Sequence, residues 1–144
     1  MTRQTEVSPT VLYAEIQHFY ARHMQLLDDG KADEWAATFT ADGSFLAPNL
    51  NEPVRGRDAL AAAVRKTAAQ LAEIGEIHRH WHGMTAVTPR EDGSVLARCY
   101  ALVFATPKGG EPRLHRTCVC EDVLVPDGTG WLVRDRRVTR DDMP

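Results

Sequence analysis

The feature that most constrains the fold of this chain is a change in the spacing of its apolar residues at Gly75. Before this glycine, apolar side chains recur three or four positions apart, which is the period of helices with one buried face. After it, the side chains follow the two-residue period of β-strands. Helices followed by strands predict an α+β fold, in which a strongly curved, mainly antiparallel sheet wraps the helices and encloses one pocket.

The first helix is expected to begin at Ser8-Pro9, because serine is a favourable cap and proline suits the first turn. It is expected to end at Asp28-Asp29-Gly30. One side of this helix is apolar and should pack on a core. The residues of that side are Leu12, Ile16, Phe19, Tyr20, Met24 and Leu27.

Two shorter helical segments follow. The second helix is expected to carry Trp35 and Phe39 one turn apart on one face, before a brief strand at residues 44–46. The third is expected to be capped by Asp58 and to end at Gly75. Its apolar stripe consists of Leu60, Val64, Ala68, Leu71 and Ile74.

Four long strands are expected after the third helix. Turns at Gly93, Gly109-Gly110 and Asp127-Gly128 join these strands into an antiparallel meander. The strands are expected at residues 78–87, 94–106, 113–125 and 131–139.

The length of 144 residues suffices for one core. We therefore expect one domain over residues 1–144, with a flexible start at 1–8 and a tail at 140–144. A net charge of -3, from 17 basic and 20 acidic residues, gives no field that would gather polyanions, so no nucleic-acid partner is expected.

The N-terminus has no apolar segment of the kind found in secretory signals, and no apolar run approaches the length of a membrane span. The odd number of cysteines, Cys99, Cys118 and Cys120, suits a reducing compartment better than a disulfide framework. We therefore expect a soluble, cytoplasmic protein with no membrane partner.

Several segments carry a resemblance to a known family. Residues 26–39, with the sequence LLDDGKADEWAATF, and Ala41 to Phe45 resemble the opening signature of SnoaL-like domains in the nuclear-transport-factor superfamily. That superfamily also contains scytalone dehydratase and the β subunits of ring-hydroxylating dioxygenases. Arg79-His80-Trp81 and residues 130–138 extend the similarity over most of the chain.

Within this family, residues 56–59 and 115–122 are most similar to actinorhodin-type proteins that tailor aromatic polyketides. The resemblance implies a cone-shaped barrel, a homodimer, and a cofactor-independent pocket for a small aromatic or polycyclic substrate. It implies dehydration, isomerisation, cyclisation or simple binding, and the fold alone does not choose among them.

His80 is the leading candidate catalytic residue, with Asp28 as its partner, because scytalone dehydratase holds a histidine and an aspartate at the matching positions. A carboxylate bonded to one imidazole nitrogen leaves the other nitrogen to move a proton near neutral pH. The alternative is that His80 fills the core and that Asp28 only ends a helix. Asp29 competes with Asp28 for the position facing the pocket.

Further pocket residues are proposed on the first helix and on the second long strand. Tyr20 and His23 lie within two turns before Asp28, close enough to reach a common pocket, although Tyr20 is equally compatible with the core. Cys99 belongs to a face of small residues that is expected to line the cavity, while the bulky opposite face meets a partner subunit. The small residues are Ala97, Cys99, Ala101, Val103 and Ala105.

The third long strand offers His115 and Thr117, which are expected to share one face with Val119 and Glu121. Alignment with scytalone dehydratase places this face toward the pocket, where His115 and Thr117 could contact substrate oxygens. The alternative for His115 is an exposed residue at the start of the strand.

No metal is predicted. His78, His80 and His82 share a face, but neighbours on one face of a strand are about 6.6–7 Å apart and cannot easily converge on one ion. No carboxylate or thiolate spacing joins them, although His78 and His82 could still share the site of His80. The mixed charges of residues 134–142 indicate a solvated face or an interface, with no catalytic role.

The chain departs from scytalone dehydratase at its substrate-orienting tyrosines, whose places hold Leu27 and approximately Ala47, and at its second pocket histidine, which aligns near Ala105. A different ring system or a milder proton transfer is therefore expected. The leading hypothesis is a polyketide tailoring enzyme, that is, a dehydratase, isomerase or cyclase that acts by proton transfer. The alternative is a non-catalytic ligand-binding or oligomerising scaffold that resembles a dioxygenase β subunit.

Overall fold

The computed structural model describes residues 8–143. Three helices and six strands make up the structure, and helix α4 lies between the two short strands and the four long ones. In chain order these elements are α2 (Pro9–Asp28), α3 (Ala32–Ala36), β1 (Phe39–Leu46), β2 (Val54–Arg55), α4 (Arg57–Ile74), β3 (Glu76–Pro89), β4 (Val95–Pro107), β5 (Arg113–Asp127) and β6 (Gly130–Arg140).

All six strands belong to one sheet with the order β2-β1-β6-β5-β4-β3. Strand β1 runs parallel to β6, and every other neighbouring pair is antiparallel. The predicted α+β class with a mixed, mainly antiparallel sheet is therefore confirmed. The meander of β3 to β6 is the part that the turn glycines predict.

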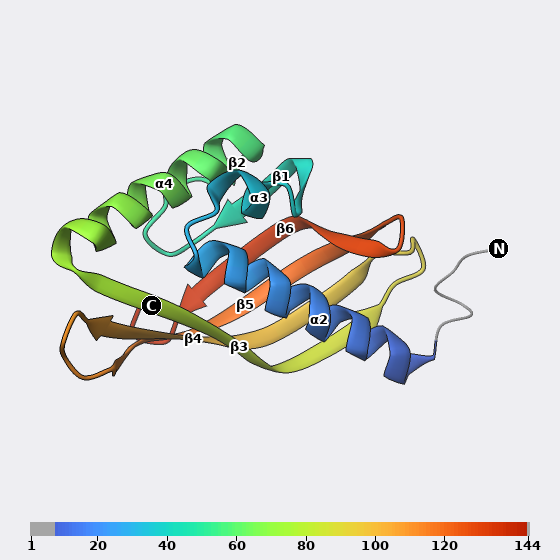
Figure 1. Ribbon diagram of the computed structural model, residues 1–144. Helices are drawn as coiled ribbons and strands as arrows, with labels where there is room; N and C mark the ends of the chain where they lie inside the picture. The colour runs from blue at the N-terminus through green and yellow to red at the C-terminus, as the bar shows by residue number, and fades with distance from the viewer. Residues whose placement is uncertain (1–7, 144) are drawn as a thin grey trace.

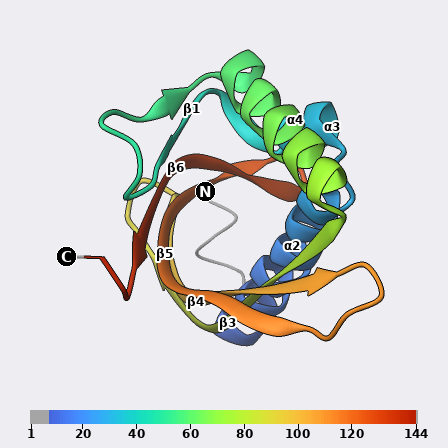
Figure 2. The same cartoon turned by 90° about the vertical axis from the view of Figure 1, so that its left-hand side faces the viewer.

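The sheet curls strongly, and the helices close its open side (Figure 1). Viewed end-on, β6, β5, β4 and β3 form an arc, while α2, α3 and α4 lie across from it (Figure 2). The core fills the space between the two, with Ile16 and Phe39 fully buried. Burial of such large apolar side chains stabilises the fold by about 1.5–3 kcal/mol each.

The ends of the long helices follow from local chemistry. Ser8 Oγ accepts a hydrogen bond from the Val11 N–H at 3.1 Å and caps α2. Gly75 adopts a left-handed conformation, with φ 67°, at the end of α4. Both ends are as predicted, because serine satisfies an orphan N–H and glycine has no Cβ to oppose a positive φ.

Two local predictions are wrong. Gly56, not Asp58, is the N-cap of α4, and Asp58 lies inside the first turn without capping it. Phe39 is the first residue of β1 rather than part of a helix, so this strand is longer than the predicted 44–46. The Trp35 and Phe39 rings still pack edge to face, with centroids 4.8 Å apart. Their contact comes from the helix-to-strand turn instead of a helical face.

The predicted flexible start at 1–8 lies outside the described residues except for Ser8, which caps α2. The predicted tail at 140–144 begins one residue early, because Arg140 still belongs to β6, and Pro144 is not described. Over residues 8–143, no helix has both the length and the apolar character needed to cross a membrane.

Candidate active site and buried polar cluster

Asp28 and His80 form a hydrogen-bonded pair. The Nδ1 atom of His80 lies 2.6 Å from Asp28 Oδ1, and the backbone N–H of His80 donates to Asp28 Oδ2 at 3.1 Å. Because the carboxylate can only accept here, Nδ1 carries the proton and Nε2 is left with a free lone pair. This is the arrangement of a histidine prepared to accept a proton at Nε2.

The fold positions this pair from two elements. Asp28 is the last residue of α2, whereas His80 projects from the inward face of β3 opposite Val103 of β4. Asp29 is exposed and forms the C-cap of the same helix, at the rim of a pocket. Of the two adjacent aspartates, it is Asp28 that meets the histidine.

Two neighbouring pockets, rather than the single one expected, meet at this pair. A larger pocket of about 810 Å³ lies under α4, and a smaller one of about 260 Å³ lies along α2. Asp28 and His80 line both. The larger pocket is within the usual range of small-molecule sites, about 300–1,000 Å³. Its apolar walls include Leu60, Val64, Leu71, Phe45 and Val103.

One part of the larger pocket is polar. Glu76, His78, His115 and Arg116 belong to its lining. The His78 and His115 rings are 5.1 Å apart, and His78 Nε2 lies 2.9 Å from Glu76 Oε1. The hydrogen bond from His78 lowers the pKa of Glu76, while burial and the charge of Arg116 lower the pKa of His115. His115 therefore lies at the pocket, as predicted.

Thr117 does not share this position, so the predicted face of β5 is wrong. Val103 pairs with Arg116 and Phe104 with Leu114, which leaves His115 as an extra residue in a β-bulge. A bulge breaks the alternation of faces along a strand. Thr117 consequently lies opposite Leu102 on the outer face, and the inward residues of β5 are Cys118, Cys120, Asp122 and Leu124.

Tyr20 lines the smaller pocket and belongs to a buried polar network. Its hydroxyl donates to Asp122 Oδ2 at 2.7 Å, and Arg136 donates to both oxygens of Asp122 at 2.9 and 2.8 Å. Burial raises the pKa of Tyr20, and the Asp122 charge raises it further. Burial alone would raise the pKa of Asp122, but Arg136 holds it below its usual range.

The prediction that the charges of the closing strand face solvent is therefore wrong for Arg136, which is only 3% exposed. A signal was present in the sequence. Arg136 is two residues from Val138, and Asp122 is two residues from both Cys120 and Leu124, so both charged side chains stand in line with apolar ones.

His23 belongs to the core rather than to either pocket. Its ring stacks on Phe19 and on Trp35, and its Nδ1 lies 2.6 Å from Thr38 Oγ1. The Thr38 hydroxyl donates its only proton to the Trp35 carbonyl, so Nδ1 must be the donor to Thr38. The remaining His23 nitrogen, Nε2, is buried without a hydrogen-bond partner among the described residues.

We expect His23 to make folding weaker in acid. Burial and the charge of Arg136 lower the pKa of His23 well below its usual value, so the folded state keeps the ring neutral. The unfolded state takes up a proton below about pH 6.5, and stability therefore falls as the pH falls through that value, by up to about 1.4 kcal/mol per pH unit. Urea unfolding at about pH 7.5 and 5.5 should show a smaller loss in His23→Phe than in the wild type. Parallel losses would refute this assignment.

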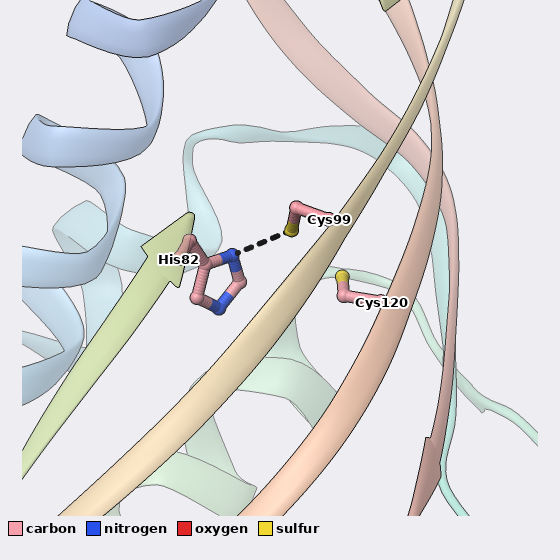
Figure 3. Close-up of side chains that lie close together, drawn as sticks. All are labelled: His82, Cys99 and Cys120. Carbon is pink, nitrogen blue, oxygen red and sulfur yellow. Dashed lines mark hydrogen bonds between the residues drawn. The ribbon is translucent and has the colours of Figure 1, made fainter. Parts of the chain in front are cut away.

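Three side chains form a second cluster beside the Asp28–His80 pair. Cys99 of β4 and Cys120 of β5 stand directly opposite each other, and His82 Nδ1 lies 3.5 Å from Cys99 Sγ (Figure 3). Hydrogen bonds from Cys120 and then from His82 lower the pKa of Cys99 against the effect of burial. The bond to Cys99, burial and the Asp122 charge raise the pKa of Cys120.

This cluster corrects two sequence-based predictions. Cys99 points inward, as expected, but is not among the residues that line the two pockets. The alternating histidines do have thiol neighbours, because the strand register brings Cys99 and Cys120 to His82. His82 also lines the smaller pocket together with His80, whereas His78 lines the larger one.

Comparison with known proteins identifies relatives over nearly the whole chain. Residues 11–137 match the family model described as a SnoaL-like domain. ActVI-ORFA from Streptomyces coelicolor is 33% identical, with a TM-score of 0.87, and the match covers 94% of this chain and 99% of that chain. Aln2 from another Streptomyces species is 34% identical, with a TM-score of 0.83 and coverage of 94% of both chains.

A protein from Catenulispora acidiphila, whose structure is in complex with S-DNPA, is 37% identical. That match has a TM-score of 0.78 and covers 92% of this chain and 96% of the other. No curated protein is similar enough to match the chain.

Proposed function

Because the chain belongs to the SnoaL-like domain family, we propose that it is a cofactor-independent polyketide tailoring enzyme, a dehydratase, isomerase or cyclase, in which His80 and Asp28 move a proton on an aromatic polyketide-like substrate. The observation that carries this proposal is the 2.6 Å contact between His80 Nδ1 and Asp28 at the junction of two pockets.

In the proposed mechanism, Nε2 of His80 removes a proton from a carbon beside a substrate carbonyl. The negative charge of Asp28 stabilises the imidazolium that forms and keeps the ring in one orientation. The same nitrogen then returns the proton to a departing hydroxyl, which completes dehydration, or to another carbon, which completes isomerisation. General acid–base catalysis of this kind contributes about 10²–10⁴-fold to the rate.

The larger pocket suits a polycyclic substrate. Its apolar wall on α4 and β4 would hold the rings, and the His78, His115 and Arg116 side chains would meet oxygen atoms or an acidic group. The Catenulispora relative supports this use of the fold, because it was solved with the small molecule S-DNPA bound. Tyr20 and the smaller pocket stand on the other side of the catalytic pair.

The pocket itself can be tested with S-DNPA as a binding probe. We expect calorimetric titration to show binding to the wild type, and Leu71→Trp to weaken it by at least about tenfold, since the indole would occupy space in the larger pocket. One clash or lost apolar contact is worth about 1–3 kcal/mol. Equal affinities would place the ligand elsewhere, and Val11→Trp, at an exposed position on α2 outside both pockets, serves as the control.

The proton transfer needs a separate assay. Polycyclic hydroxyketones incubated with the protein in D₂O should gain deuterium beside the carbonyl faster than without protein. Detection by proton NMR follows the exchanged carbon directly. Binding of ligands without exchange or turnover across such a panel would favour the second candidate.

That second candidate is a non-catalytic ligand-binding or oligomerising scaffold similar to a dioxygenase β subunit. A specific observation favours it: Leu27 and Ala47, which stand near the places of the dehydratase tyrosines, both line the larger pocket and offer no hydroxyl to orient a substrate. Co-purification with a larger oxygenase chain would support the scaffold.

We also infer a homodimer. The outer face of β3, β4 and β5 exposes Trp81, Tyr100 and Leu114, with exposed fractions of 66%, 47% and 54%. A patch of large apolar side chains of this kind commonly marks an interface. Light scattering after size exclusion should give twice the chain mass for the wild type and the single chain mass for Trp81→Lys/Tyr100→Lys. Val11→Lys, at an exposed site on α2, should remain dimeric, and a monomeric wild type would contradict the inference.

A further inference from the structure

The His82, Cys99 and Cys120 cluster has no part in the proposed proton transfer. Its three side chains come from three neighbouring strands, β3, β4 and β5, and all point into the space enclosed by the curved sheet (Figure 3). One ligand atom from each residue lies within 4.8 Å of the other two. Both cysteines are almost completely buried, each with 1% exposure, whereas His82 borders the smaller pocket.

The spacing of these atoms matches the needs of a tetrahedral ion. Zinc bonds of about 2.3 Å to sulfur and 2.0–2.1 Å to nitrogen place the ligand atoms about 3.6–3.8 Å apart. The observed distance from His82 Nδ1 to Cys99 Sγ is 3.5 Å. Because Cys99 and Cys120 face each other across paired strands, the rigid sheet holds the second sulfur close without a loop.

The charges around the cluster favour a divalent ion. Asp122 accepts a hydrogen bond from Cys120 at 3.4 Å, but its own charge is already balanced by Arg136. Two thiolates at Cys99 and Cys120 would therefore bring two uncompensated negative charges into the core. One divalent cation cancels both, whereas a monovalent ion would leave a buried net charge.

We propose that His82 Nδ1, Cys99 Sγ and Cys120 Sγ bind one zinc ion, with thiolate and imidazole as the ligand class. On binding, each thiol loses its proton to solvent and the imidazole stays neutral, so two protons are released per ion. Three protein ligands leave a fourth position for water or another small ligand. The ion reaches the cluster through the smaller pocket, which His82 lines.

Cobalt provides the direct test, because Co²⁺ replaces Zn²⁺ in such sites and its thiolate complexes absorb strongly in the near ultraviolet. Full-length protein without an affinity tag is freed of metal with a chelator, reduced with a phosphine and titrated with CoCl₂. We expect the charge-transfer band to saturate at one Co²⁺ per chain and to disappear when ZnCl₂ is added. Zinc should also raise the thermal unfolding midpoint.

Matched variants locate the ligands. Cys99→Ser and Cys120→Ser are expected to abolish the band, and His82→Gln to weaken cobalt binding by at least tenfold. Cys118→Ser should keep the band, because Cys118 is buried on the same face of β5 but lies outside the cluster. Circular dichroism checks that each variant is folded.

Two results would overturn the proposal. One is the lack of a charge-transfer band in the folded wild type at one equivalent of cobalt. The other is a Cys99–Cys120 disulfide that forms in zinc-loaded protein once the reductant is removed, detected by thiol counting and mass spectrometry. Both readouts are independent of catalytic turnover, so they separate this proposal from the proposed function.

Discussion

Replacing Arg136 with methionine is expected to lower the free energy of unfolding by about 3–5 kcal/mol, which is the usual cost of leaving a buried charge without its partner. Asp122 is fully buried, and Arg136 donates two hydrogen bonds to its two oxygens. In Arg136→Met, the Tyr20 hydroxyl and the Cys120 thiol would be the remaining neighbours of the carboxylate. Neither carries a positive charge. Urea unfolding followed by circular dichroism measures the loss.

A matched variant distinguishes the unpaired charge from lost packing. In Tyr20→Phe/Asp122→Leu/Arg136→Met, apolar side chains of similar size replace the whole network, and such exchanges are often neutral or stabilising. We therefore expect the triple variant to be clearly more stable than Arg136→Met alone. If both are destabilised equally, the network contributes through its shape and not through its charge balance.

Most of the fold could be predicted from the sequence because it depends on local signals. The change of period at Gly75, the Ser8 cap and the turn glycines mark the two long helices and the four long strands to within a few residues. The two-residue strand β2, at Val54–Arg55, was missed, because it is too short to show a period.

The faces of the strands were harder to predict because bulges interrupt the alternation. A bulge at His115 turned Thr117 to the outer face, and another register shift follows Val133 in β6. Arg136, in the segment after that shift, points inward. A strand that is read as perfectly alternating assigns such residues to the wrong side, and one extra residue is enough to do so.

The two clusters differ in how they could be found. Asp28 and His80 were paired through a resemblance that covers both segments, and the structure brings the two side chains into contact. The cluster of His82, Cys99 and Cys120 has no motif, because its members come from three strands and their register decides the contact. Spacing along one chain carries no information about such a register.

Removing the imidazole in His80→Ala is expected to lower kcat by about 10²–10⁴-fold, with a small effect on KM, for any substrate that shows proton exchange. The reason is that Nε2 is the proposed base and no other described residue hydrogen-bonds to the Asp28 carboxylate. Asp28→Asn should also lower kcat, because an amide cannot balance the imidazolium charge. The rate is measured as deuterium incorporation or substrate loss at saturating substrate.

Two neighbouring substitutions make this result specific. Arg79→Ala changes the exposed residue that precedes His80 on β3 and should retain full turnover, because its side chain lines neither pocket. Asp29→Asn changes the adjacent carboxylate at the rim of the larger pocket and should lower kcat far less than Asp28→Asn, because both hydrogen bonds to His80 come from Asp28. A wild-type rate in His80→Ala would remove the proposed base. A loss in His80→Ala together with an unaffected Asp28→Asn would leave His80 acting without the carboxylate, since charge balance at the imidazolium would then contribute nothing to the rate.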